Sequence, residues 1–178
     1  IVIMNITNEQ ADYLLLLPKK IVDNEGKPLD WIVIDQKFPF YERFDLSSEK
    51  DDEFSFLWQI RQGSKNTLQI SLHFQEDDSK TGLLRIDYNG GHTNPQIINE
   101  YVPERFHPYA GQQLMESHIH YYVQSYPPLA WAAPLAEDDF AVKEINENDF
   151  NATLVEVVKL FAKAVNIETV ININALLL

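Results

Sequence analysis

The 178-residue sequence contains no cysteine and only 6 glycines. Without cysteine, disulfide scaffolds, zinc sites with cysteine ligands and thiol catalysis are excluded. The apolar run from Leu14 to Leu17 ends at Pro18, far short of the roughly 18 residues that a membrane-spanning helix needs, so we expect no membrane association. The start of the chain lacks the features of a secretory signal, which favours a cytoplasmic protein. Phosphate-loop, dinucleotide-binding and kinase signatures are also missing.

Positive charge is scarce as well, with 14 Lys and Arg against 27 Asp and Glu and a net charge of -13. Nucleic-acid affinity rests mainly on phosphate neutralisation, so a long polyanion should be repelled. The ordinary meaning of such an excess is solubility. Residues 61–135 are nearer neutral, with 5 basic and 7 acidic side chains, and can still receive an anion. All five histidines lie in this stretch: His73, His92, His107, His118 and His120.

The composition, 45% hydrophobic and 23% charged, is that of a globular protein, and the length indicates a single domain spanning residues 1–178. We expect an α+β fold. A bent antiparallel sheet of about five to seven strands, arranged as a meander, would pack its apolar face against an N-terminal and a C-terminal helix.

Both helices have sequence signals. Thr7 and Gln10 form a capping box, which opens a helix that Pro18 stops after Leu17. Near the other end, Asn148 or Asp149 would cap a helix with one apolar stripe. The stripe comprises Leu154, Val157, Val158, Phe161 and Val165.

The strands follow from period-2 alternation. The clearest runs are 54–61, 68–74 and 83–88, joined by short turns, and residues 116–124 and 129–135 have the same character. Asp23 to Gly26 is typical of a hairpin turn between runs 19–23 and 29–36, and residues 38–46 form a further strand-like run. Residues 89–115 are expected to be a long loop, and 171–178 an apolar tail that is either a terminal strand or a surface for a partner.

If the strands are regular, their non-apolar sides gather on one sheet face. His118 and His120 could then act as acid and base, Arg85 could stabilise a phosphate, and Asp87 or Tyr122 could orient a histidine. These are the parts of metal-independent phosphodiester cleavage, so the leading hypothesis is a ribonuclease-like or anion-binding site with RNA as a candidate partner and no cofactor. The full set is Ser55, Gln59, Arg61, Gln69, Ser71, His73, Arg85, Asp87, His118, His120 and Tyr122.

Three alternatives stay open. His118 and His120, two residues apart on a strand, could hold a metal together with His73 or His92. The same face could be purely structural and covered by the long loop. The protein could also be a non-enzymatic interaction protein, such as an immunity protein, antitoxin or inhibitor, whose acidic surface docks on a basic partner.

The stretch from residue 85 to 135 resembles a group of uncharacterised small bacterial and phage-associated domains. The shared pattern stands here as Arg85-Ile86-Asp87, His92-Thr93-Asn94-Pro95, His118-Ile119-His120-Tyr121-Tyr122 and Trp131-Ala132-Ala133-Pro134-Leu135. The sequence departs from it at Tyr121, which shifts the expected tyrosine, and in a longer loop before His118. The resemblance implies a prokaryotic, mobile-element or defence-linked origin, for example in a toxin–antitoxin system, and carries no established activity.

Overall fold

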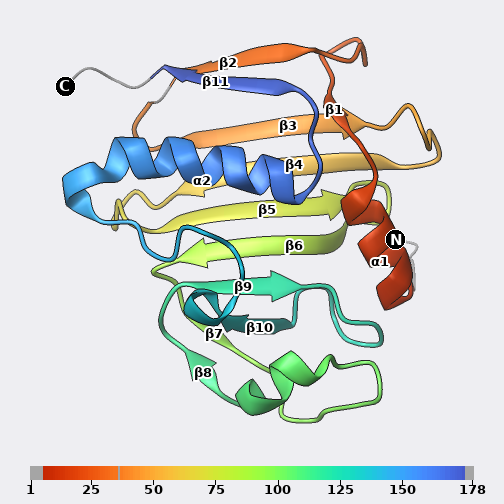
Figure 1. The fold of residues 1–178 in the computed structure, drawn as a ribbon, viewed down its shortest axis with the longest axis vertical. Coiled ribbons are helices and arrows are strands. Elements are labelled where there is room, and N and C mark those ends of the chain that lie inside the picture. Colours follow the sequence, from red (N-terminus) through yellow and green to blue (C-terminus); the bar gives the residue numbers. More distant parts are fainter. Residues whose placement is uncertain (1–5, 36, 175–178) are drawn as a thin grey trace.

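The computed structural model describes residues 6–35 and 37–174, and it has the expected α+β architecture (Figure 1). Within these residues, seven strands form one antiparallel sheet in the order β1-β3-β4-β5-β6-β9-β10. Strands β3 to β6 are sequential neighbours, which confirms the meander. The strands are β1 (Lys20–Ile21), β3 (Tyr41–Ser47), β4 (Ser55–Gln62), β5 (Ile70–Glu76), β6 (Thr81–Tyr88), β9 (His118–Tyr121) and β10 (Trp131–Pro134).

Helix α2 (Phe150–Ala164) lies across one face of this sheet (Figure 1). The predicted stripe is buried, and the ring of Phe161 stacks on Trp58 of β4 with centroids 6.1 Å apart. A short 3-10 turn, Glu147–Asp149, precedes the helix, and the side chain of Asn146 caps this turn. The alternation of β4, β5 and β6 therefore places their apolar side against α2, and the opposite side is the polar face referred to below.

Helix α1 (Asn8–Leu16) begins as predicted. Thr7 accepts from the backbone N–H of Gln10, and the Gln10 side chain accepts from the backbone N–H of Thr7. Ala11 and Leu14 are buried in the same core as the sheet. The capping box and Pro18 thus fix a short helix at one end of the apolar face.

A buried lysine joins the two helices. Lys19 is 1% exposed, and its Nζ donates to the carbonyl oxygens of Leu15 and Leu17 at the end of α1 and of Val165 at the end of α2. Burial lowers the pKa of the Lys19 ammonium to about 7. Three carbonyl acceptors and the negative ends of two helices favour the charged form. This side chain therefore closes both helix C-termini at once.

The predicted hairpin at residues 23–26 is correct as a turn but wrong as a strand pair. Asp23 accepts from the N–H of Gly26 and closes the turn. Strand β1 pairs with β3, however, and β2 (Trp31–Asp35) pairs with β11 (Val170–Asn174) in a separate parallel sheet. Pro28 lacks the N–H that would extend the ladder beyond a single bridge to Val22.

The C-terminal segment is a strand for as far as the structure describes it. Strand β11 lies in register with β2, with Ile171 opposite Ile32. Residues 175–178 of the predicted apolar tail lie outside the described residues. No helix in the described part of the chain has the length and apolar character to cross a membrane.

Residues 89–115, predicted as a long loop, contain short elements of secondary structure. They contain β7 (His92–Thr93), a 3-10 helix (Glu104–Tyr109) and β8 (Gln113–Leu114), with β7 and β8 paired. A second small core holds this segment against β9 and β10. Its buried members are Val102, Phe106, Val123, Trp131 and Ala133.

Candidate functional site

Two rows of polar residues run across the polar face, because four antiparallel strands lie in regular register there. The rows cross β4, β5, β6 and β9. We name them the Asp87 row and the Arg85 row. The Asp87 row is Arg61, Ser71, Asp87 and His118, and the Arg85 row is Gln59, His73, Arg85 and His120.

Asp87 is the centre of the site, and its side chain is 13% exposed. Its Oδ2 lies 2.8 Å from Nε of Arg85, 3.2 Å from Nε2 of His120 and 3.7 Å from Nε2 of His118. The Arg85 Nε also donates to Oδ1 at 3.0 Å. One carboxylate thus lies close to a guanidinium of its own strand, β6, and to two imidazoles of the neighbouring strand, β9.

The backbone fixes the orientation of both histidines. Nδ1 of His118 lies 2.7 Å from the carbonyl oxygen of Glu116, and Nδ1 of His120 lies 2.9 Å from that of Leu129. A carbonyl can only accept, so each Nδ1 carries its hydrogen and donates it. Each Nε2 therefore faces Asp87, and within the described part of the chain Nε2 of His118 is buried with no hydrogen-bond partner.

Burial and charge shift the ionisation of this cluster in opposite directions. Burial acts to raise the pKa of Asp87, but the His120 hydrogen bond and the Arg85 charge outweigh it and hold that pKa well below its usual range. Burial lowers the pKa of His118, against the opposing effect of its bond to Glu116. Burial likewise lowers the pKa of His73 and of His92. Asp87 is therefore charged at neutral pH, and His73, His92 and His118 are neutral.

The segment after β6 covers the histidine pair. The ring of His92 lies edge-on to His120 at 4.5 Å, 5.9 Å from that of His118, and its Nε2 donates to the carbonyl of Ala130. Asn94, 2% exposed, is bound to the backbone N–H and carbonyl of Ala132 in β10. Sequence reasoning gave neither residue this role, although both stand in the His-x-Asn-Pro part of the quoted pattern.

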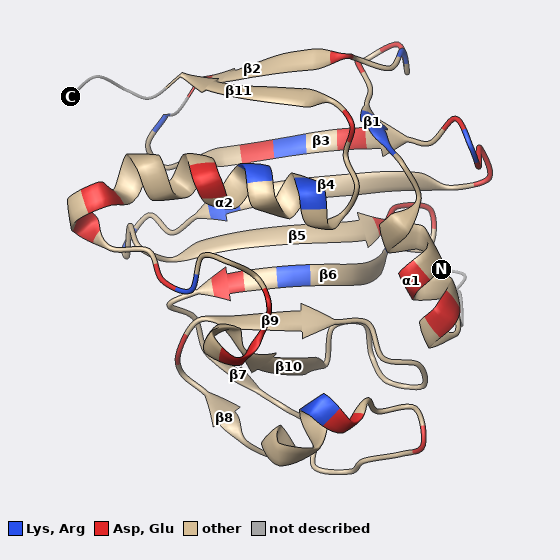
Figure 2. Ribbon diagram, in the orientation of Figure 1, with Lys and Arg blue, Asp and Glu red and all other residues tan. Residues whose placement is uncertain are grey.

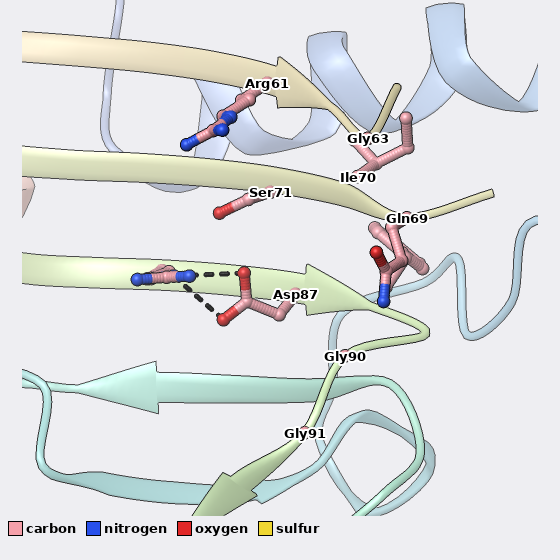
Figure 3. Close-up of a pocket in the computed structure, with 10 residues that line it drawn as sticks. Arg61, Gly63, Gln69, Ile70, Ser71, Asp87, Gly90 and Gly91 are labelled. Atoms are coloured by element: carbon pink, nitrogen blue, oxygen red, sulfur yellow. Dashed lines mark hydrogen bonds and ion pairs between the residues drawn. The ribbon is translucent and has the colours of Figure 1, made fainter. Parts of the chain in front are cut away.

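A pocket of about 290 Å³ opens on the polar face beside Asp87 (Figure 3). Its charged side chains are Arg61, Arg85 and Asp87, its hydroxyl side chains are Ser71 and Tyr88, and Gly90 and Gly91 also line it. Figure 3 shows the side chains of Arg61, Ser71 and Asp87 on three neighbouring strands at this pocket. The two histidines lie beside this pocket and are not among the residues that line it.

Of the five residues nominated from the sequence, the structure brings four together: Arg85, Asp87, His118 and His120. Tyr122 lies elsewhere, with its hydroxyl donating to the carbonyl of Ile6 in the main core. The reason is that β9 ends at Tyr121, so the strand alternation that would place Tyr122 beside His120 does not continue.

The metal-ligand set that the geometry groups is also different from the expected one. Asp87, His118 and His120 place one possible ligand atom each within 4.8 Å of one another. His73 instead bonds to Gln75 and His92 to Ala130. The third member of the group is thus a carboxylate from β6.

Comparison with known proteins gives a family and no activity. No curated protein and no solved structure matches the chain. One family model, described as a family of unknown function (DUF6978), matches residues 6–167, a span that includes the whole polar face. The chain therefore belongs to this family of unknown function, DUF6978.

Proposed function

We propose that the polar face binds a small anionic ligand through a phosphate group, in the pocket lined by Arg61, Ser71 and Arg85. The observation that supports this most directly is the presence of two guanidinium groups and a hydroxyl around one open pocket of about 290 Å³. Guanidinium groups match the planar geometry of phosphate and carboxylate oxygens. No carboxylate among the described residues forms an ion pair with Arg61, so its charge is available to a ligand.

Asp87 orients Arg85 for this role. Its contacts with Arg85 are made through Nε, and Arg85 is among the residues that line the pocket. His120 in turn contacts Asp87 through Nε2 at 3.2 Å. The cluster therefore presents a preorganised donor group, which reduces the entropy that ligand binding would otherwise cost.

Acid–base cleavage of RNA receives less support than anion binding. In both histidines Nδ1 is bound to the backbone and Nε2 faces Asp87, so neither ring nitrogen points into the pocket. A general base must come within hydrogen-bond reach of the proton it removes. In the proposed site the pocket therefore binds a ligand, and the histidines are positioning residues.

The test is calorimetric titration of the purified protein with inorganic phosphate and with a nucleoside monophosphate. Arg61→Gln should weaken binding about tenfold or more, the loss expected for one charge-assisted hydrogen bond. Arg43→Gln is the matched control, because Arg43 lies opposite Gln59 on the same face and outside the pocket. Equal affinity of the wild type and Arg61→Gln, or no binding at all, would overturn the proposal. Incubation with total RNA in parallel would show whether cleavage accompanies binding.

A second candidate function is docking on a basic protein partner. It is favoured by the exposed acidic side chains of Glu49, Asp52 and Glu53 in the turn between β3 and β4, together with the net charge of -13 (Figure 2). Such binding should weaken steeply with salt and persist in Arg61→Gln. A pull-down of a bacterial or phage-encoded partner that elutes at high salt would support it, and a salt-insensitive interaction would not.

A further inference from the structure

We infer that Asp87, His118 and His120 form a binding site for a divalent transition-metal ion, with Zn²⁺ as the ion that their chemistry fits. This goes beyond the anion pocket, because two of the three ligands do not line that pocket. Two imidazoles and one carboxylate are the donor set that catalytic zinc sites and non-haem iron sites share. Imidazole with carboxylate, without thiolate, also excludes a preference for soft monovalent copper.

The possible ligand atoms lie close to the spacing that one metal ion requires. Oδ2 of Asp87 is 3.2 Å from Nε2 of His120 and 3.7 Å from Nε2 of His118, and the three residues offer ligand atoms within 4.8 Å of one another. Metal–ligand bonds of about 2.0–2.1 Å in a tetrahedral site put ligand atoms roughly 3.3 Å apart. Rotation of the two imidazole rings would bring their Nε2 atoms closer together, so that one ion could contact all three ligand atoms.

Hydrogen bonds from Nδ1 orient both histidines as metal ligands. A histidine that binds a metal through Nε2 commonly donates Nδ1–H to a carbonyl or carboxylate, which fixes the tautomer and the ring orientation. Both histidines do this here, to the backbone of Glu116 and Leu129. The two Nε2 atoms are thereby directed at the same carboxylate oxygen, an arrangement that an ion between them satisfies.

The Nε2 atom of His118 is buried and lacks a hydrogen-bond partner among the described residues. The residue as a whole is 1% exposed. His120 differs, because its Nε2 lies within hydrogen-bond distance of Asp87, at 3.2 Å. Buried polar atoms in native proteins nearly always have a partner, so this nitrogen points to a missing one.

The surroundings hold the three ligands in place. Asp87 and His118 are opposite each other in the β6–β9 ladder, and His120 lies opposite Arg85 in the next row. The ring of His92 packs against both imidazoles. Three protein ligands leave a coordination position for water or for a ligand oxygen, as in catalytic rather than structural zinc sites.

The charge of Arg85 should affect the Zn²⁺ affinity of this site. Its Nε lies 2.8 Å from the same Oδ2 that would bind the ion, and its positive charge opposes a second cation there. Replacing Arg85 with Gln should therefore tighten Zn²⁺ binding several-fold. The same change should weaken phosphate binding in the pocket, so the two sites respond in opposite directions.

The experiment is titration of the full chain, freed of metal by dialysis, with Zn²⁺ by calorimetry and with Co²⁺ by visible absorption. We expect one ion per chain. The Co²⁺ absorption spectrum should be that of a four-coordinate protein site and not that of the hydrated, six-coordinate ion. His118→Gln and Asp87→Asn should each lower the affinity at least tenfold. His73→Gln and His107→Gln are matched controls that remove histidines outside the cluster and should leave the affinity unchanged.

Circular dichroism would check that each variant is folded, and the wild-type Co²⁺ spectrum is a readout that does not depend on any variant. A hydrated-ion spectrum, absence of binding at micromolar Zn²⁺, or equal losses in the control variants would each overturn the metal site. None of these outcomes touches the phosphate titration of Arg61→Gln, so failure of one proposal is distinguishable from failure of the other.

Discussion

A single residue, Lys19, joins two distant parts of the chain, the ends of α1 and α2, through three backbone carbonyls. Replacing it with Met keeps the apolar stem but leaves the carbonyls of Leu15, Leu17 and Val165 without their donor. Each buried group left unpaired costs about 1–3 kcal/mol, so Lys19→Met should lower the free energy of unfolding by on the order of 3 kcal/mol. Chemical denaturation measures this.

The neighbouring residue supplies the control for that experiment. Lys20 pairs with Asp30 at the surface, where the acid is 83% exposed, so Lys20→Met should change stability little. If Lys19→Met and Lys20→Met have the same small effect, Lys19 does not close the two helices in solution.

Buried tyrosines should make the free energy of unfolding decrease at alkaline pH. Burial raises the pKa of Tyr88, whose hydroxyl donates to the carbonyl of Val142, and of Tyr121. A raised pKa means that these groups stabilise the fold fully below the unfolded value near 10, and that this stability is lost as pH rises beyond it. The free energy of unfolding should fall above pH 10 by about 1.4 kcal/mol per pH unit for each tyrosine.

Tyr88→Phe isolates one of these contributions. At pH 8 the variant should be about 1 kcal/mol less stable, because it lacks the bond to Val142. Between pH 10 and 11 the two stability curves should converge, since only the wild type has that group to ionise. Parallel curves over this range would contradict the assignment.

The alternation in the sequence predicted which polar side chains share a sheet face wherever the strands are regular. The register of β5 and β6 shifts between Phe74 and Gln75, and the pairs Ser71–Asp87 and His73–Arg85 lie on one side of that shift. The polar rows therefore kept their predicted facing. Tyr122 failed because the end of a strand depends on tertiary packing, here on the second core below β10, and sequence periodicity does not contain that information.

At the scale of elements, the sequence predicts the features that depend on residues close together in the chain. The capping box of α1 and the stripe of α2 are local signals, and both are confirmed. The pairing of β2 with β11 joins residues about 140 positions apart, and the fold of residues 89–115 rests on contacts with β9 and β10. No periodicity within either segment encodes these partners.

Asn94 is the residue through which the segment 89–115 is attached to the sheet. Asn94→Ala removes two hydrogen bonds to Ala132 and leaves its buried N–H and carbonyl unpaired. We expect a loss of about 2–4 kcal/mol, concentrated in this segment and β10, because two buried groups lose their partners. Hydrogen exchange should show faster exchange of the Ala132 amide and little change in β4 and β5. Uniform acceleration across the sheet would instead mean that the segment and the sheet unfold as one unit.

At the scale of the whole molecule, a cationic pocket lies in a protein of net charge -13. Figure 2 shows acidic residues on α1, on α2 and in the connecting turns. Arg85 belongs to β6, in the middle of the sheet. If the pocket binds one phosphate as proposed, each further phosphate of a long polymer would approach an acidic surface.

The charge distribution thus predicts how affinity should depend on ligand length. A 12-nucleotide RNA should bind no more tightly than a nucleoside monophosphate, and its salt dependence should correspond to about one phosphate contact, a slope of roughly -0.7 in log K against log salt. Fluorescence anisotropy at several salt concentrations measures both quantities. An affinity that rises with RNA length and falls with a steep salt slope would show that the polar face continues into a polyanion-binding surface. It would return RNA to the position of leading candidate ligand despite the net charge.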